Sequence, residues 1–367
     1  MNTTGKTPFV IVAALGITGL FIFFYILYIG SGIILPVIYA AIMAVLLNPL
    51  VNRLCRHRIN RVLAIGIAVI LLLLLFFGLM YFVIDQSLRF ADSLPVLQQK
   101  LNMLLQQFTQ WASRTFRVSG DKVDKYIVDT ENRQLNASAA ILGQTLITAT
   151  AVLKLFFLIP VYVFMFLFYK PLLLDFFSRV FRRESHETVG EVLYETKTLI
   201  QSYLVGLLLE AAIVAALNGI GLLLLGIDYA LLLAIIGALL NIIPYIGGIV
   251  AVVLPVLIAY TTKSPVYVLW VLALYMAVQF IDNHYIMPRI VASKVRINAL
   301  VSIVVVFIGG AIWGVAGMFL AVPLTAILKV IFDRITPLNP WGFLLGDTMP
   351  PIGKIIFKSP PESKKKP

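Results

Sequence analysis

The stretch Tyr229–Thr262, YALLLAIIGALLNIIPYIGGIVAVVLPVLIAYTT, carries no charged residue and is divided by a proline- and glycine-rich break at Pro244–Gly248. Each half holds about 12–15 residues and spans about 18–22 Å as a helix, whereas the hydrocarbon core of a bilayer is about 30 Å thick. Proline ends helices, and non-helical backbone at membrane depth is tolerated only where it is buried in protein or lines a cavity. The stretch therefore predicts two half-length helices that form a re-entrant hairpin in a membrane.

A second uncharged stretch, Ala299–Leu328, is broken by glycines rather than by proline. Its first arm, Ala299–Ile308, is too short to cross a bilayer. We therefore expect a second re-entrant hairpin, which enters the membrane from the face opposite to the first. Opposed hairpins can meet near the midplane and present unpaired backbone groups to a solute, as the discontinuous helices of secondary transporters do.

The whole chain has the composition of a membrane protein. Of its 367 residues, 60% are hydrophobic and only 13% are charged, whereas soluble domains carry about 25% charged residues. The basic residues gather in short loops and in the tail, so the net charge of +12 follows the positive-inside rule and does not indicate a nucleic-acid partner. The lipid bilayer is the predicted partner. The single cysteine, Cys55, excludes an intrachain disulfide and a thiolate metal site.

The remaining apolar stretches predict six full spans. They are Pro8–Ile29, Ile33–Val51, Val62–Ile84, Thr145–Tyr169, Leu199–Leu225 and Val266–Ile281. The loop after the second span is free of acidic residues, which places this loop and both termini in the cytoplasm. Its arginines are Arg53, Arg56, Arg58 and Arg61. Between the third and fourth spans, the polar segment Asp85–Gln144 has one amphipathic stripe and balanced charge, so it predicts a small extracytoplasmic helical insertion.

These elements divide the chain into five regions. We expect a three-span membrane region (1–84), the insertion (85–144), the fourth span with a cytoplasmic helix (145–198), a transport region with the broken hairpins (199–335) and a cytoplasmic tail (336–367). The cytoplasmic helix carries glutamates at a spacing of four and is expected to run into the fifth span. The predicted fold class is all-α: a polytopic membrane protein with about six full spans, two re-entrant helical hairpins and the extracytoplasmic insertion.

Three motifs in the second half resemble a known family. They are Asn241-Ile-Ile-Pro-Tyr-Ile-Gly-Gly248, Gln279-Phe-Ile-Asp-Asn283 followed by Pro288, and Gly309-Gly310-x-x-x-Gly314-x-x-Gly317 followed by Ala321-Val-Pro323. In order and spacing the chain resembles the autoinducer-2 exporter (AI-2E) family over nearly its whole length. The resemblance implies an oligomeric, multi-spanning permease of the bacterial inner membrane. Export of autoinducer-2 is the founding activity of that family, and other members exchange sodium for protons.

Two carboxylates are candidates for ion coupling. Glu210 lies near the middle of the fifth predicted span, where a charged side chain costs about 3 kcal/mol on insertion scales. It either forms a proton or cation site or is a neutral glutamic acid hydrogen-bonded to a neighbouring helix. Asp282 ends the sixth predicted span beside Gln279 and Asn283. It either lines the cytoplasmic mouth or belongs to a polar cluster at the membrane interface.

The predicted substrate or ion path combines these polar residues with the two breaks, whose alternative interpretation is a tight packing kink. The path comprises Glu210, Asn241, Pro244, Tyr245, Gly247, Gly248, Gln279, Asp282, Asn283, Gly309, Gly310 and Gly314.

Catalysis is not predicted. The three histidines, His57, His186 and His284, lie far apart in the expected topology, and the sequence has no P-loop and no hydrolase or zinc-protease motif. We therefore expect no catalytic residue, no metal site and no cofactor. The leading prediction is a gradient-driven secondary transporter of a small solute such as autoinducer-2. The alternatives are a sodium/proton antiporter and a membrane scaffold that does not transport; two intramembrane breaks favour transport, because a scaffold has no need of them.

Overall fold

The structure, a computed structural model, describes residues 9–91, 157–243, 247–292 and 295–348, together with single positions between 99 and 110. Most of the predicted insertion, the start of the fourth predicted span, Pro244, Tyr245 and the end of the tail lie outside the described residues. In the described part the elements are helices, and one isolated β-bridge pairs Ile297 with Gly346.

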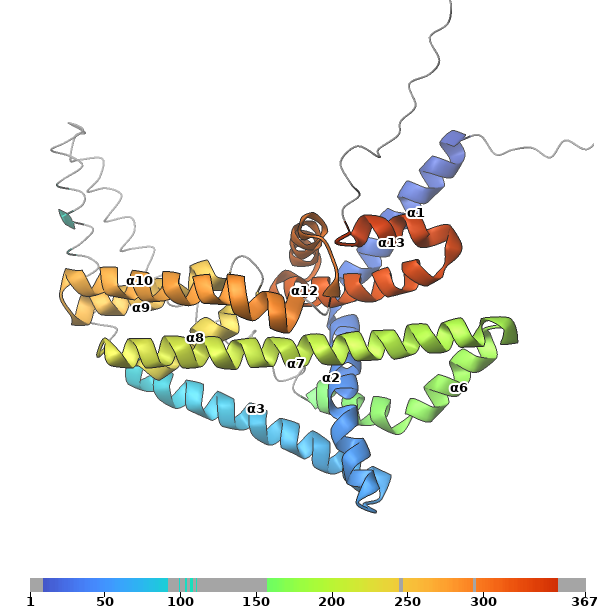
Figure 1. The fold of residues 1–367 in the computed structure, drawn as a ribbon, viewed down its shortest axis with the longest axis horizontal. Coiled ribbons are helices and arrows are strands. Elements are labelled where there is room, and N and C mark those ends of the chain that lie inside the picture. Colours follow the sequence, from blue (N-terminus) through green and yellow to red (C-terminus); the bar gives the residue numbers. More distant parts are fainter. Residues whose placement is uncertain are drawn as a thin grey trace, which may run out of the picture.

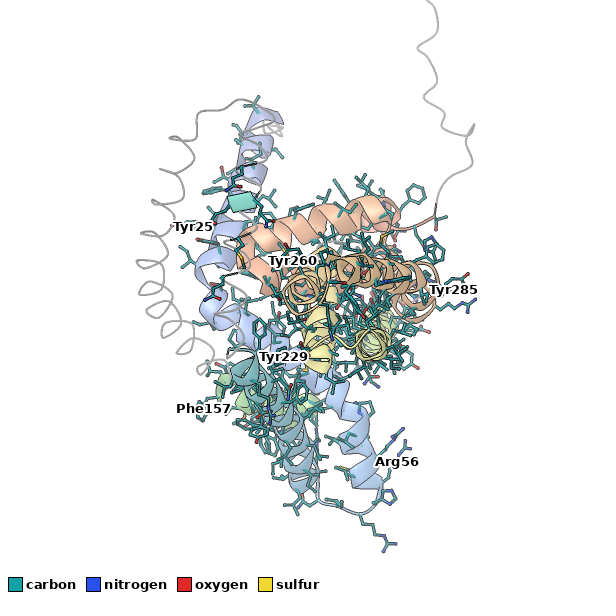
Figure 2. The ribbon with its side chains drawn as sticks, turned by 90° about the vertical axis from the view of Figure 1, so that its left-hand side faces the viewer. Tyr25, Arg56, Phe157, Tyr229, Tyr260 and Tyr285 are labelled. Atoms are coloured by element: carbon teal, nitrogen blue, oxygen red, sulfur yellow. The ribbon has the colours of Figure 1, made fainter. Side chains whose placement is uncertain are left out.

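The first three helices agree with the first three predicted spans. They are α1 (Phe9–Ile29), α2 (Ser31–Arg56) and α3 (Arg61–Ala91). Side chains of α1 are largely exposed in the described chain, and Tyr25 is 54% exposed (Figure 2). Helix α2 packs against α3 and the helical residues 157–168, and Ala40, Ile65 and Val163 lie in their common buried cluster.

The chain then bends and returns. The helix Phe157–Phe168 bends by 62° into α6 (Lys170–Val180). After a short 3-10 turn, α7 (His186–Leu224) continues for 39 residues, or about 58 Å. The glutamate-bearing part of the predicted cytoplasmic helix and the fifth predicted span are therefore one continuous helix, whereas the residues from Lys170 to Val180 form the separate helix α6. Figure 1 shows α7 running almost the length of the described molecule.

The first broken stretch forms two short helices, as predicted. Helix α8 (Ala230–Asn241) has 12 residues and α9 (Gly247–Thr262) has 16, so each is shorter than the about 20 residues that a full crossing needs. The two helices pack together in a cluster that includes Leu233, Ala251 and Val271. This cluster holds both against α10 (Pro265–Ile281), which begins with proline in its first turn.

Helix α10 ends at the predicted residue, but the chain does not leave the helical path there. Two π-helical segments, η2 (Asp282–Ile286) and η3 (Pro288–Ala292), carry the helix onward. The sequence predicted Asp282 at the end of a helical segment, and this prediction was wrong. Asp282 lies where the helix changes from α-helical to π-helical winding. Single π-turns inside helices are rare and are frequent at functional sites.

The second broken stretch folds back on itself. Within α12 (Ala299–Arg334), Trp313 and Gly314 leave the helical conformation, and Gly314 has a φ of +61°, which glycine adopts without steric cost. A Cβ atom added to Gly317 would lie 1.9 Å from the carbonyl oxygen of Gly309. In a straight helix these two residues would be about 12 Å apart. The predicted second hairpin is thus present.

The tip of this hairpin contacts the first two helices. The indole Nε1 of Trp313 donates to the carbonyl oxygen of Leu27 at 2.8 Å, and the hydroxyl of Tyr39 donates to that of Ala316 at 3.1 Å. Tyr39 also stacks on Phe319, with ring centroids 6.0 Å apart. At its other end α12 continues to α13 (Asn339–Leu345).

Among the described residues, six helices are long and apolar enough to cross a membrane by length and composition: α1, α2, α3, α7, α10 with its π-helical continuation, and α12. Of these, α12 is folded back at Trp313 and Gly314 and is therefore a hairpin and not a straight span. The bent pair at residues 157–180 passes the same test as a unit. The described chain is thus an all-α, polytopic membrane protein, and α7 is its central helix because it packs against α2, α8, α10, α12 and η3.

Candidate transport cavity

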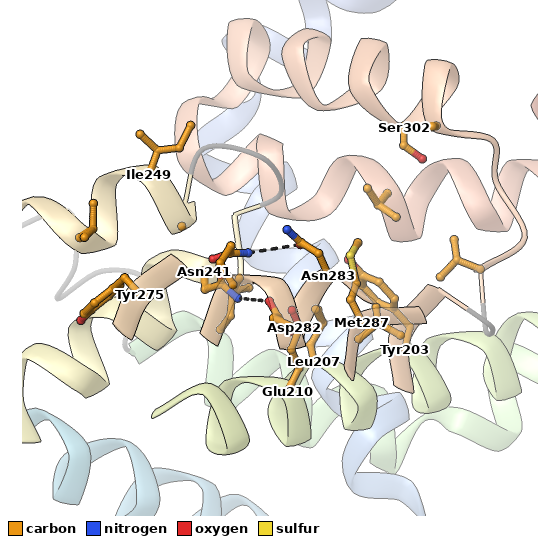
Figure 3. Close-up of a pocket in the computed structure, with 18 of the residues that line it drawn as sticks. Tyr203, Leu207, Glu210, Asn241, Ile249, Tyr275, Asp282, Asn283, Met287 and Ser302 are labelled. Carbon is orange, nitrogen blue, oxygen red and sulfur yellow. Dashed lines mark hydrogen bonds between the residues drawn. The ribbon is translucent and has the colours of Figure 1, made fainter. Parts of the chain in front are cut away.

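A cavity of about 670 Å³ lies beside α7, where the broken helices and the π-helical segment meet (Figure 3). Most of its lining is apolar, with residues such as Leu207, Val252 and Met287. Polar side chains come from four helices and η2. They are Tyr203, Glu210, Asn241, Tyr275, Gln279, Asp282, Asn283 and Ser302. An apolar pocket of this size with a few polar groups is typical of a small-molecule site.

Asn241 and Asp282 join the first hairpin to the π-helical segment. Asn241 is the last residue of α8, and its Nδ2 donates to Oδ2 of Asp282 at 2.9 Å. Asp282 is only 2% exposed, and among the described atoms its Oδ1 has no hydrogen-bond partner. A buried polar atom without a partner is costly. The arrangement therefore suits a ligand that supplies a proton, a cation or a hydroxyl group to this oxygen.

Glu210 is the second buried acid of the cavity. Its side chain projects from α7 and is 7% exposed. Figure 3 shows Glu210 beneath Asp282, so two buried carboxylates line the same cavity. No described lining residue is a lysine, an arginine or a histidine. The cavity therefore attracts cations and hydrogen-bond donors and disfavours anions.

Gly248 allows the amide side chains to approach the start of α9. A Cβ atom at this position would lie 2.4 Å from Oε1 of Gln279 and 3.3 Å from Oδ1 of Asn241. Gln279 in turn donates from Nε2 to Oδ1 of Asn283 at 3.2 Å. Glycine is thus required here for close packing of polar groups, because any side chain would displace Gln279.

The structure brings six of the predicted path residues to this one cavity. They are Glu210, Asn241, Gly248, Gln279, Asp282 and Asn283. Gly247 begins α9 and packs against the end of α8, where a Cβ atom would be 1.9 Å from the carbonyl oxygen of Leu240. Pro244 and Tyr245 belong to the same break but lie outside the described residues. The role of this set in transport stays a prediction.

The glycines of the second hairpin are placed elsewhere. Gly309 packs against Gly317, and Gly310 packs against Met318, so both bring the two arms of α12 together. Gly314 makes the turn between the arms. None of the three lines the cavity. Their predicted place in the solute path stays untested, whereas their part in folding the hairpin is evident.

Three polar lining residues escaped the sequence analysis: Tyr203, Tyr275 and Ser302. Helical spacing could have found two of them. Tyr203 lies seven residues before Glu210, and Tyr275 lies four before Gln279, so each shares a helix face with a predicted residue. Ser302 follows the start of α12 and had no such partner in the sequence.

Comparison with known proteins agrees with this architecture. Residues 17–336 match the model of the AI-2E family transporters. The chain is a member of the AI-2E transporter family. The family assignment and the six apolar helices together establish a multi-pass membrane protein of a transporter family.

Several relatives are similar over most of their length. The chain is 26% identical to the AI-2 transport protein TqsA of Escherichia coli K12, over 87% of this chain and 90% of that protein. It is 28% identical to the putative permease PerM of the same organism, over 84% of this chain and 89% of that protein. It is 24% identical to a putative transport protein of Haemophilus influenzae, over 91% and 95%. Their names describe transport and permeation.

Proposed function

We propose that the chain transports a small, uncharged, hydrogen-bonding solute such as autoinducer-2 through the cavity beside α7, and that an ion gradient drives the transport. The observation that carries the proposal is the single cavity that unites the end of α8, the start of α9 and the π-helical segment. The name of the relative TqsA gives autoinducer-2 as the solute to test first.

The chemistry of the lining supports a neutral polar solute. Asn241, Gln279 and Asn283 offer amide donors and acceptors, and Asp282 offers an unpartnered acceptor oxygen. Planar amide and carboxylate groups can bind neighbouring hydroxyl groups. The two acids without a cationic partner in the described lining disfavour a phosphate or carboxylate solute.

The test is flux of autoinducer-2 into liposomes that contain the purified protein, with and without an imposed sodium or proton gradient. Asp282→Asn should lower the flux by about 10- to 150-fold, because it removes a charge-assisted hydrogen bond worth about 1.5–3 kcal/mol. Asp175→Asn is the matched control, since Asp175 lies on α6 in an exposed ion pair with Arg179. Flux equal to that of empty liposomes, with correctly folded protein, would refute the proposed solute.

Sodium/proton antiport is the second candidate, and one observation favours it specifically. Glu210 and Asp282 are two buried carboxylates that line the same cavity, so a proton or a sodium ion bound there would offset the cost of two charges held away from water. A pH-sensitive dye inside the liposomes would report antiport as a sodium-dependent pH change without any organic solute. Antiport should be lost in both Glu210→Gln and Asp282→Asn, and activity that survives in both variants would exclude this pair as the exchange site.

A further inference from the structure

Three basic residues lie near one another around the bend between the helix Phe157–Phe168 and α6. Arg61 begins α3, and its guanidinium donates to the carbonyl oxygen of Leu167 at 2.7 Å. Lys170 begins α6, just after the bend, and its ammonium donates to Oδ1 of Asn48 at 3.0 Å. Since Leu167 and Lys170 are three residues apart across the bend, these two contacts place both cations near the bend of the helix pair.

A third contact brings Lys197 to the same place. Gln201 lies one turn after Lys197 on α7, and its Nε2 donates to the carbonyl oxygen of Val45 at 2.7 Å. Val45 lies one turn before Asn48, the residue that Lys170 contacts. Lys197 and Arg61 are accordingly both close enough to Lys170 to repel its ammonium group. We call Arg61, Lys170 and Lys197 the basic triad.

The basic triad has no counter-charge within the described part of the chain. The nearby acids are used elsewhere: Asp175 pairs with Arg179, and Glu191 and Glu195 both pair with Arg334. None of the three triad cations forms an ion pair with a described carboxylate. Like charges held together in this way favour an anionic ligand.

Helix α6 indicates what kind of anion this is. None of its residues is buried, although most are apolar, and Leu172 is 60% exposed. The exposed apolar side chains include Leu172, Leu173, Leu174, Phe176 and Val180. A short amphipathic helix with cations at one end matches a phospholipid, whose acyl chains cover apolar side chains while its phosphate meets basic ones.

We propose that the basic triad binds the phosphate of an anionic phospholipid, such as phosphatidylglycerol, whose acyl chains lie along α6. This site is separate from the cavity beside α7 and does not depend on which solute the protein carries. On the predicted topology the lipid belongs to the cytoplasmic leaflet, because Arg61 ends the arginine-rich loop.

Native mass spectrometry of the full chain in a neutral detergent tests the proposal, with phosphatidylglycerol and phosphatidylcholine of equal chain length as probes. Phosphatidylglycerol should bind more tightly. Lys197→Gln should weaken its binding by about fivefold, and Lys170→Gln with Lys197→Gln by about thirtyfold. Lys197→Arg should retain binding, because it keeps the charge. Arg179→Gln is the matched control, since Arg179 is basic but 80% exposed, paired with Asp175 and outside the triad.

Lys197→Gln should fold like the wild type, because Lys197 makes no side-chain hydrogen bond to a described residue. A loss of lipid binding in this variant therefore does not result from misfolding. Equal affinity of wild type and Lys197→Gln for phosphatidylglycerol would overturn the proposal. So would equal binding of the two lipids by the wild type. Inorganic phosphate that displaces the lipid at equal concentration would show a site for small anions instead, and would also overturn it.

Discussion

The two neighbouring glycines at the start of α9 should respond to the same substitution in opposite ways. In Gly248→Ala, the new methyl group would lie 2.4 Å from Oε1 of Gln279 and 3.3 Å from Oδ1 of Asn241. Both obstacles are ends of flexible side chains, so the backbone can stay in place. In Gly247→Ala, the methyl group would lie 1.9 Å from the carbonyl oxygen of Leu240, which is backbone. The first variant should fold with an altered cavity, and the second should fail to form the turn.

The magnitude for Gly248→Ala follows from the displacement of Gln279. Its Oε1 must retreat by about 1 Å to reach an ordinary contact distance. The off-rotamer side chain costs about 0.5–1.5 kcal/mol, and the hydrogen bond to Asn283 at 3.2 Å is strained or lost, which costs about 0.5–1.5 kcal/mol. Because that bond is exposed, we expect the free energy of unfolding to fall by about 1–2 kcal/mol. Since Gln279 also lines the cavity, its displacement should lower solute affinity as well.

Flux of autoinducer-2 into liposomes at subsaturating solute measures this loss, after membrane abundance has been matched. Gly314→Ala is the control for glycine loss in general. Its φ of +61° makes alanine cost about 1–2 kcal/mol, but no atom lies within 4 Å of the new methyl group and the cavity is unchanged. Wild-type flux in Gly248→Ala, or normal abundance of Gly247→Ala, would refute the steric reasoning.

Three further predictions concern other parts of the chain. Glu210→Gln keeps the shape of the side chain but cannot titrate, so flux across a pH series should lose its pH dependence while folding is preserved; an unchanged profile would return Glu210 to a structural role. Arg334→Ala breaks the ion pairs with Glu191 and Glu195, and because these are exposed the free energy of unfolding should fall by about 1 kcal/mol or less, with a smaller effect at high salt. Trp313→Phe removes the donor to the carbonyl oxygen of Leu27, so the free energy that holds the hairpin tip against α1 should fall by about 1 kcal/mol. Amide hydrogen exchange at the end of α1 should then become faster, and unchanged exchange would contradict the prediction.

The broken helices were predictable because their cause is local. Absence of charge between Tyr229 and Thr262 identifies a membrane segment, and the break at Pro244–Gly248 divides it into lengths too short to cross. The structure has α8 and α9 on either side of that break. The same holds for α12, where Gly314 supplies a left-handed conformation that few other residues tolerate.

The path of the chain after Ile281 was not predictable in the same way. A charged and polar sequence at a span end normally marks a loop, and the sequence therefore predicted Asp282 at such an end. The switch from α-helical to π-helical winding depends on which carbonyl each amide finds, and that choice leaves no periodic signature in a segment of this length. Burial of Asp282 beside Glu210 is therefore a result of tertiary structure.

Long-range contacts also decided the role of the second hairpin. Sequence alone showed that Gly309 and Gly310 lie near a break, but not whether they face a solute or a neighbouring arm. In the structure they face Gly317 and Met318. The tip contacts Leu27 and Tyr39, which are nearly three hundred residues away in the chain, and no local pattern specifies such a partner.

The position of Asp282 connects ion binding to the first hairpin. One oxygen of this carboxylate accepts the amide of Asn241 at the end of α8, and the other has no partner among the described atoms. Asp282 lines the same cavity as Glu210. A charged acceptor forms a hydrogen bond about twice as strong as a neutral one. A proton or cation that arrives on the second oxygen therefore weakens the bond from Asn241 by about 1 kcal/mol, without touching α8 itself. On the proposed function, an ion gradient would act on the broken helices through this one side chain, because the group that senses the ion is also the group that holds the hairpin.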